Sequence, residues 1–315
     1  MDYVIGIDSG STKYLIKARS LDGQILGQVK GPTANHRIIG TEKAGEAIKT
    51  MVTELLSSFG AAPGDCRCLV AAAAGIDSEQ DRAAVQALYG VLGLSCPLFC
   101  MNDAMAALYA ATQGQGVLSI SGTGSIAVGR NSQGRITRSG GHPTSIFGDE
   151  GSSRWMALMA MRHASRWIDG MVPPSALTDK LDSFFGGLDA NKLSQTAARY
   201  KQSPVETELA VLVYEAAKEG DQGALEIIQQ GARELFDLAL SCVHKLSLDQ
   251  DPSFKSGVWG SVFVENHFFY ETYRDLFLKA YPQCQVVFPQ GDAADGALDL
   301  AADYLEGKIP FIGEL

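Results

Sequence analysis

Two short segments rich in glycine and hydroxyl side chains each follow an apolar run of strand length. One occupies residues 9–12, directly after Asp8, and the other occupies residues 121–125. Glycine lets backbone N–H groups approach an anion closely, and serine and threonine add hydroxyl donors. A carboxylate such as Asp8 suits a magnesium ion or its bound water. Two such turns facing each other would clamp a chain of phosphates, whereas two ordinary glycine-rich hairpins are the alternative.

A third candidate is Asp103, which lies between an apolar run at residues 97–101 and a helical pattern at 104–111. Ligands collect at the carboxyl ends of strands in α/β sheets. Asp103 could therefore accept the proton of an attacking hydroxyl group. An aspartate at this position could equally cap the helix, and the position alone does not separate the two roles.

Two further segments combine small residues with polar or open backbone. Residues 147–153 place Asp149 and Glu150 between glycines before a helical pattern. Carboxylates there could accept hydrogen bonds from sugar hydroxyls, or they could stabilise the helix N-terminus. Gly260 follows a strand-like run and could let a flat ring lie against the backbone, although a simple turn explains it as well.

The six cysteines and five histidines show no metal-site spacing. Cys66, Cys68, Cys96 and Cys100 lie near two predicted strands, but the paired two-residue spacings of zinc and iron–sulfur sites are absent. No two histidines are spaced as ligands on one helix face. We expect reduced thiols and no metal site built on cysteine or histidine.

Composition describes an ordinary globular protein. The chain has 315 residues, enough for two domains, with 46% hydrophobic and 20% charged residues. A net charge of −10 argues against a nucleic-acid surface, so bound phosphate must be held by backbone donors and metal. No apolar run approaches the ~20 residues of a membrane helix. Because a strand begins at residue 2 or 3, we expect no signal peptide and a cytoplasmic protein.

Hydrophobic periodicity divides the chain into two similar halves, each running strand-strand-strand-helix-strand-helix-strand-helix, with extra helices in the second. This alternation predicts an α/β fold whose sheets are covered on both faces. Strands are predicted near residues 3–8, 14–18, 25–29, 69–74, 97–101, 117–121, 126–129, 256–260 and 285–288, with one more after the turn at 131–134. Helices are predicted near 41–59, 79–92, 104–111, 151–168, 175–185, 191–201, 205–219, 221–246, 265–280 and 292–306.

The order of these elements and several motifs resemble the actin, hexokinase and heat-shock ATPase superfamily. Within it, the chain is similar to the BadF/BadG-type ATPases and the N-acetylglucosamine kinases. The matching segments are Gly6 to Thr12, Ala73 to Gly75, Asn102 to Ala104, Ser121 to Ser125, Gly148 to Ser152, Gly260-Ser261 and Asp292 to Ala297. The resemblance implies two ribonuclease H-like domains with a nucleotide cleft between them. The domains would span residues 1–114 and 115–296, with a closing helix at about 297–315 packing back on the first.

The resemblance also implies an ATP-dependent kinase that transfers the γ-phosphate to a hydroxyl of an amino sugar, N-acetylglucosamine first of all. Asp103 would be the catalytic base, and Asp8 would orient Mg²⁺. The implied ATP-binding residues are Gly10, Ser11, Thr12, Lys13, Gly122, Thr123, Gly124, Gly260 and Ser261. The implied sugar-binding residues are Asn35, Asp103, Gly141 and Asp149. The partners would be sugar and ATP, with no nucleic acid or membrane, and the protein would be a homodimer.

Two departures from the family pattern leave the sugar open. His142-Pro143 follows the glycine pair where these kinases usually have tryptophan, and Ile126 stands where asparagine or cysteine is common. Glucosamine and N-acetylmuramic acid are therefore alternative substrates. A dehydratase-activating ATPase is a second alternative, but its cluster needs cysteines just beyond the second turn, and none lies between Cys100 and Cys242. A sugar-responsive regulator is a third alternative, and the intact acids favour turnover over it.

Overall fold

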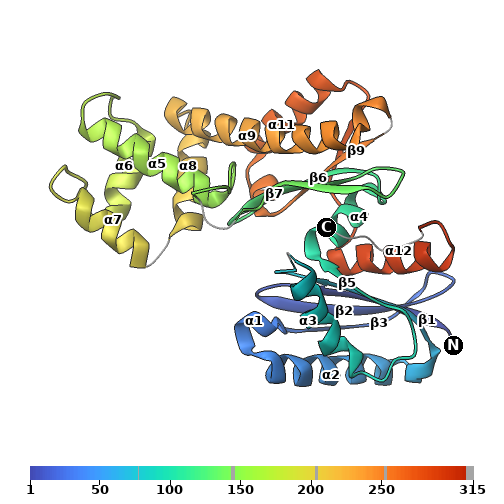
Figure 1. Ribbon diagram of the computed structural model, residues 1–315. Coiled ribbons are helices and arrows are strands. Elements are labelled where there is room, and N and C mark those ends of the chain that lie inside the picture. Colours follow the sequence, from blue (N-terminus) through green and yellow to red (C-terminus); the bar gives the residue numbers. More distant parts are fainter. Residues whose placement is uncertain (77, 143–145, 203–204, 252–253, 310–315) are drawn as a thin grey trace.

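Two five-stranded mixed sheets form the framework of the protein (Figure 1). The computed structural model describes residues 1–76, 78–142, 146–202, 205–251 and 254–309. The strand order is β3-β2-β1-β4-β5 in the first sheet and β10-β9-β6-β7-β8 in the second. The strands are β1 (Tyr3–Ser9), β2 (Lys13–Ser20), β3 (Ile25–Pro32), β4 (Cys66–Ala73), β5 (Leu98–Asn102), β6 (Gly116–Ser121), β7 (Ser125–Arg130), β8 (Ile136–Gly140), β9 (Lys255–Trp259) and β10 (Gln285–Val287).

The longer helices fall where the periodicity predicts them. They are α2 (Thr41–Ser58), α3 (Glu79–Gly90), α4 (Asp103–Thr112), α5 (Ser153–Ile168), α6 (Ala176–Phe185), α7 (Leu193–Gln202), α8 (Glu206–Lys218), α9 (Gln222–Leu246), α11 (His267–Ala280) and α12 (Ala293–Leu305). Four short elements were not predicted: α1 (His36–Ile39), α10 (Ser261–Glu265) and the 3₁₀ turns Pro63–Asp65 and Leu248–Gln250. Three to five residues are too few to show a helical period.

The central strand β1 is buried along its whole length because helices cover both faces of its sheet. Tyr3, Ile5 and Ile7 belong to one core that includes side chains of α2. Val4 points the other way, into a core shared with Leu298 of α12 and with α4. This placement explains why β1 reads as a continuous apolar run rather than as an alternating strand.

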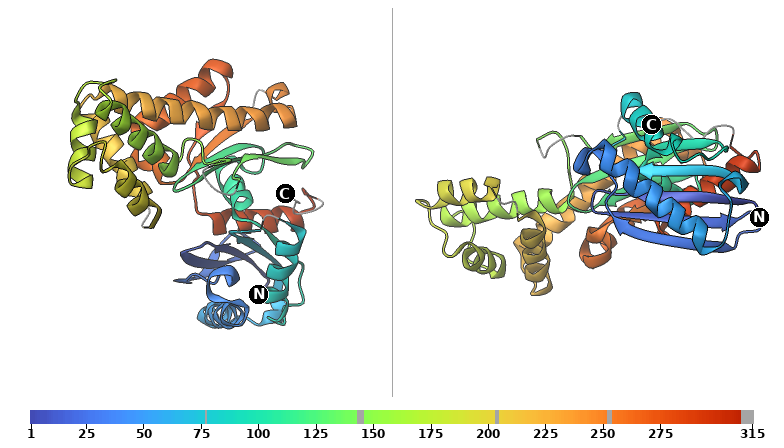
Figure 2. Two further views of the ribbon diagram at one scale, coloured as in Figure 1. Left: turned by 60° about the vertical axis from the view of Figure 1, so that its left-hand side comes forward. Right: turned by 90° about the horizontal axis from the view of Figure 1, so that it is seen from below.

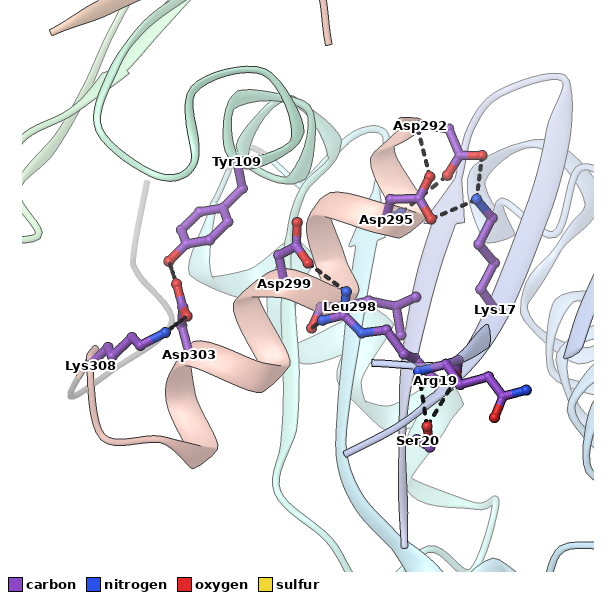
Figure 3. A network of polar contacts seen from close by, with 11 residues as sticks. Lys17, Arg19, Ser20, Tyr109, Asp292, Asp295, Leu298, Asp299, Asp303 and Lys308 are labelled. Atoms are coloured by element: carbon purple, nitrogen blue, oxygen red, sulfur yellow. Dashed lines mark hydrogen bonds and ion pairs between the residues drawn. The ribbon is translucent and has the colours of Figure 1, made fainter. Parts of the chain in front are cut away.

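The last helix, α12, packs on the first sheet against β1, β4 and α4. Figure 3 shows how ion pairs tie it to β2: the Lys17 Nζ lies 2.8 Å from Asp292 Oδ2 and 2.7 Å from Asp295 Oδ1. Further along, Arg19 Nη1 donates to Asp299 Oδ1 at 2.6 Å. Residues 310–315 lie outside the described ranges, and the domain boundaries at 114/115 and 296/297 stay a prediction.

The second sheet carries most of the helices. The long helix α9 packs against β6, β7 and β8, and α5 packs on α6, α8 and α9. Figures 1 and 2 show α6 and α7 projecting beyond the edge of this sheet, away from the first sheet, while α4 lies between the sheets. Within the described ranges, no helix is both long and apolar enough to cross a lipid bilayer.

Candidate functional site

The register of the first sheet brings its polar candidates to one edge. Strands β1, β4 and β5 are parallel, and the pairing sets Ser9 beside Ala73 and Ala73 beside Asn102. Asp8, the hairpin tip at residues 10–12 and Asp103 therefore lie at the carboxyl ends of neighbouring strands. Ligands bind at this edge in open α/β sheets.

The Asp8 carboxylate lies in an unusual electrostatic environment. The residue is 8% exposed, and its pKa is raised to about 6, first by burial and then by the carboxylates of Asp103 and Asp292. Lys13 opposes the shift, with its Nζ 4.0 Å from Asp8 Oδ2, but the lysine side chain is largely exposed. Negative charge therefore gathers around Asp8, and a divalent cation would relieve it.

Asp103 is not the cap of its helix. The N-cap of α4 is Asn102, whose side chain accepts a hydrogen bond from the Ala104 N–H at 3.0 Å. The Asn102 amide also donates to the Ile76 carbonyl at 3.1 Å. Asp103 is the first residue of the helix and is partly exposed. The capping interpretation of Asp103 is therefore wrong, because the preceding residue already fills that role.

Asn35 has structural contacts at both ends of its amide. Its Oδ1 accepts from the Arg37 N–H at 3.0 Å and so caps α1, and its Nδ2 donates to the Ala74 carbonyl at 3.0 Å. These bonds hold the loop before α1 against the segment that follows β4. The amide keeps one N–H and one lone pair for a further partner. Its predicted contact with a sugar stays a prediction.

In the second sheet, Asp149 lies directly against the glycine turn. Its Oδ1 accepts from the Ser125 N–H at 3.3 Å, and its Oδ2 pairs with Arg154 Nη1 at 2.6 Å. A Cβ atom added to Gly124 would stand 2.6 Å from Asp149 Oδ1. Glycine at residue 124 therefore lets the carboxylate approach the turn. Arg154 also reaches Glu206 Oε1, at 3.3 Å from its Nε.

Helix α5 begins against the same turn. The Ser153 N–H donates to the Gly122 carbonyl at 2.9 Å, and the Arg154 N–H donates to the Thr123 carbonyl at 3.3 Å. The cap of α5 is Ser152, so Asp149 is not a capping residue either. The first N–H groups of the helix hold the turn in place, while the Thr123 side of the turn stays exposed.

Glu150 is a functional candidate that the sequence analysis considered beside Asp149 but did not include among the implied sugar-binding residues. Its Oε2 is buried, and the described part of the chain offers it no hydrogen-bond partner. Buried carboxylate oxygens are rarely left in this state. The adjacent acids in the sequence were a signal for this residue, because Asp149 and Glu150 stand side by side after Gly148.

Gly260 and Ser261 lie beside the second glycine turn because β6 and β9 are parallel neighbours, with Ile120 opposite Trp259. Gly260 has φ = 101°, and a Cβ atom there would stand 2.1 Å from the Ser121 carbonyl oxygen. Only glycine fits this approach. The structure therefore brings two segments predicted to bind ATP, residues 122–124 and 260–261, into one place.

An apolar cavity of about 100 Å³ opens next to Ser261. Met156 of α5, Val211 and Tyr214 of α8, and Val262 of α10 contribute to its lining. The sequence analysis missed this cavity, because its walls come from three elements that are distant in the sequence. A cavity of this kind could accept the flat face of an aromatic base.

The glycine pair Gly140-Gly141, which precedes the acidic segment, contacts the start of β7 just after the second glycine turn. The Gly141 N–H donates to the Ser125 carbonyl at 3.1 Å, and a Cβ atom on Gly141 would stand 2.6 Å from the end of the Ile126 side chain. Ile126 and Gly141, two positions tied to substrate choice in the sequence analysis, are therefore neighbours. Pro143 lies outside the described residues.

The acids do not form a complete metal cage. Across the described residues, no three histidine, cysteine or acidic side chains gather closely enough to hold a metal ion on their own. Mg²⁺ is commonly bound through one or two carboxylates together with substrate phosphates and water. The donor set around Asp8 fits that mode and does not fit a metal site made of protein ligands alone.

Comparison with known proteins shows which family the chain belongs to. A sequence model of the BadF/BadG/BcrA/BcrD ATPase family matches residues 5–301. The chain belongs to this family. A relative from Clostridium acetobutylicum, an N-acetylmuramic acid/N-acetylglucosamine kinase, is 30% identical over 96% of this chain and 98% of its own length. An N-acetyl-D-glucosamine kinase from Dictyostelium discoideum is 28% identical over 94% of this chain and 97% of its own.

A solved structure confirms the fold. The "Putative N-acetylglucosamine Kinase" from Chromobacterium violaceum superposes with a TM-score of 0.70, covering 96% of this chain and 99% of that one at 24% identity. The predicted family and the predicted two-domain α/β fold of the actin-like ATPases are thus confirmed.

Proposed function

We propose that this protein transfers the γ-phosphate of ATP to a hydroxyl of an amino sugar, with N-acetylglucosamine the first choice. The family and the kinase relatives place the chain among ATP-dependent phosphotransferases. The observation that carries the proposal is the pair of aspartates at the carboxyl edge of the first sheet. Asp8 and Asp103 stand at the carboxyl ends of β1 and β5, the two strands that flank β4, and burial together with the charge of Asp103 raises the pKa of Asp8. One would face Mg²⁺ and the other the reacting hydroxyl.

The nucleotide would lie between the two glycine turns. The adenine would enter the apolar cavity beside Ser261, and the phosphates would meet the exposed tips at residues 10–12 and 122–124. Lys13 lies beside the first turn, with its Nζ 4.0 Å from Asp8, whereas Lys17 is already paired with Asp292 and Asp295. Bound Mg²⁺, held through Asp8, would offset the phosphate charge.

Asp103 would act as the general base on the attacking hydroxyl. It begins α4 without capping it and stands at the carboxyl end of β5, on the sheet edge that carries Asp8. Phosphoryl transfer asks the protein mainly for placement and electrostatic stabilisation. Asp8 would bind the Mg²⁺ that accompanies the phosphates, and Asp103 would orient the attacking hydroxyl. One sheet edge would therefore position both reacting groups.

The sugar would be held by groups from both halves. Asn35 keeps one N–H and one lone pair available. Asp149 is fixed by Arg154 and Ser125, and Glu150 Oε2 lacks a partner that a sugar hydroxyl could provide. Gly141 lies beside Ile126, so the shape of that wall would bear on which amino sugar fits.

A panel of sugars in a coupled ADP-release assay tests the substrate. N-acetylglucosamine, N-acetylmuramic acid, glucosamine and glucose are compared at equal concentration, and the product is identified by mass. We expect ADP release to depend on an amino sugar and a phosphorylated sugar to accumulate. Stoichiometric ADP release without sugar phosphate would contradict the proposal.

A matched pair of variants tests the sugar contact. Asn35→Ala should raise KM for the sugar more than it lowers kcat, because the amide contributes to binding in ground and transition states alike. Asn35→Asp keeps the cap of α1 but loses both amide N–H groups, including the one that donates to the Ala74 carbonyl. An unchanged KM in both variants would remove Asn35 from the sugar site.

A further inference from the structure

Two cysteine sulfurs lie in contact at the end of the first sheet that is opposite the candidate site. Cys66 is the first residue of β4, and Cys96 lies in the segment leading into β5. Their Sγ atoms are 3.3 Å apart. The parallel pairing of β4 and β5 sets this approach, with Leu69 opposite Leu98 and the Leu69 N–H bonded to the Pro97 carbonyl at 3.0 Å.

The two thiols differ in access and acidity. Cys66 is 3% exposed, whereas Cys96 is partly exposed. The hydrogen bond with Cys66 lowers the pKa of Cys96, and backbone hydrogen bonds act in the same direction. The same contact, together with burial, raises the pKa of Cys66. A partly exposed, more acidic thiol thus lies next to a buried thiol, which is the arrangement of an attacking and a resolving cysteine.

We propose that Cys66 and Cys96 form a reversible disulfide when a hydroperoxide oxidises the protein. The Cys96 thiolate attacks one peroxide oxygen, the O–O bond breaks, and the leaving oxygen takes up a proton as water or an alcohol. The product is a sulfenic acid on Cys96. The Cys66 sulfur then attacks the Cys96 sulfur, the S–O bond breaks, and water leaves with the Cys66 proton. Two thiols lose two electrons and two hydrogens, and the peroxide takes them.

The contact is specific to this pair. Cys68, Cys100, Cys242 and Cys284 are buried, and the sulfur–sulfur hydrogen bond joins Cys96 to Cys66. Their pKa values are all raised to about 12, first by burial, which keeps them protonated and unreactive. Oxidation should therefore select Cys96 first and stop at the disulfide.

Peptide mapping of the whole protein tests the proposal. The reduced chain is treated with hydrogen peroxide, remaining thiols are alkylated, and the digest is analysed without reductant. We expect one linked pair of peptides carrying Cys66 and Cys96, a mass loss of two hydrogens, and full reversal by a thiol reductant. Oxidation of Cys96 to a sulfinic acid without a link, or a link to another cysteine, would overturn the proposal.

Variants provide matched controls. Cys96→Ser and Cys66→Ala should each abolish the link, whereas Cys100→Ser, on the same pair of strands, should leave it intact. A link that survives in Cys96→Ser would overturn the assignment. Because Cys96 is partly exposed, its serine variant keeps the test valid if Cys66→Ala fails to fold. Oxidation should also raise the thermal unfolding midpoint of the wild type and leave that of Cys96→Ser unchanged, since the link closes a loop of the unfolded chain.

Discussion

The buried aspartates at the edges of the two sheets have opposite electrostatic surroundings. At the first edge, Asp8 shares its surroundings with Asp103 and Asp292, and the carboxylates raise its pKa to about 6 in addition to the effect of burial. At the second edge, the equally buried Asp149 has Arg154 at 2.6 Å and the Ser125 N–H at 3.3 Å. Asp8 has only the exposed Lys13 Nζ nearby, at 4.0 Å, whereas Asp149 is held in a direct ion pair.

This difference separates two kinds of work. An edge whose buried carboxylate has only an exposed lysine nearby favours a cation and can take up a proton, whereas an edge with a paired acid and bonded turn carbonyls is a rigid support. We therefore expect metal and proton chemistry at the first edge and positioning of nucleotide and sugar at the second. Variants at the two edges should therefore differ in what they change.

The largest effect is expected for Asp103→Asn. Removing a positioned base should lower kcat by roughly 10²–10⁴-fold. The free energy of unfolding should not fall through a lost cap, because Asn102 and not Asp103 caps α4. The matched variant Asn102→Ala should cost about 1 kcal/mol of stability through the lost cap. Steady-state kinetics measure kcat, and urea unfolding measures the free energy of unfolding. A stable Asp103→Asn protein with near-normal kcat would show that Asp103 is not the catalytic base.

The next effect concerns Asp8→Asn. The folded-state pKa of Asp8 is about 6, against an ordinary value of 3.8. Its contribution to stability is therefore fully present below about pH 4 and is lost as the pH rises through 6. Asp8→Asn should match the wild type at pH 4 and exceed it by ~3 kcal/mol at pH 8, in the absence of nucleotide and magnesium.

Turnover should move the other way. Magnesium-dependent activity should be nearly lost in Asp8→Asn, and wild-type activity should fall at acid pH, with a midpoint below 6 because bound Mg²⁺ lowers the pKa of Asp8. Urea unfolding at the two pH values and a pH–rate profile check this. Equal stability of variant and wild type at pH 8 would show that the pKa of Asp8 is not raised in the folded protein.

A smaller loss is expected for Arg154→Met at the second edge. It leaves the buried Asp149 without its cation, which should cost ~2 kcal/mol of stability, less than a fully buried pair because the arginine is one-third exposed. The matched variant Lys180→Met breaks a pair with the exposed Glu219 and should cost under ~1 kcal/mol. Chemical denaturation compares the two, and equal costs would mean that Asp149 is not held in the ion pair with Arg154.

The smallest effect is expected for Val211→Ser in the apolar cavity. Val211 is half exposed, so removing its methyl groups should raise KM for ATP about threefold and leave KM for the sugar unchanged. Val264→Ser, on the exposed side of α10 and outside the cavity lining, is the control. A similar rise in KM for ATP in both variants would remove the cavity from the nucleotide site.

The sequence could predict the features that depend on residues close together in the chain and on hydrophobic periodicity. The long elements and the meeting of Asp8 with Asp103 follow from strand patterns and parallel pairing. The pairing of Arg154 with Glu206, 52 residues away, could not be predicted, because nothing local marks either residue. Asn102 and Asp103 are both suited to a cap, and only the backbone path decides between them.

The position of α12 has a consequence for how the protein is made. Arg19 and Asp299 are 280 residues apart, yet they join the first sheet to this helix. During synthesis, the face of β1 that carries Val4 lacks α12, which packs along β1 beside α4, until the ribosome has translated beyond residue 305. Part of the first sheet keeps its apolar surface exposed until then, which favours chaperone binding. Late truncations should therefore destabilise the part of the chain that is made first.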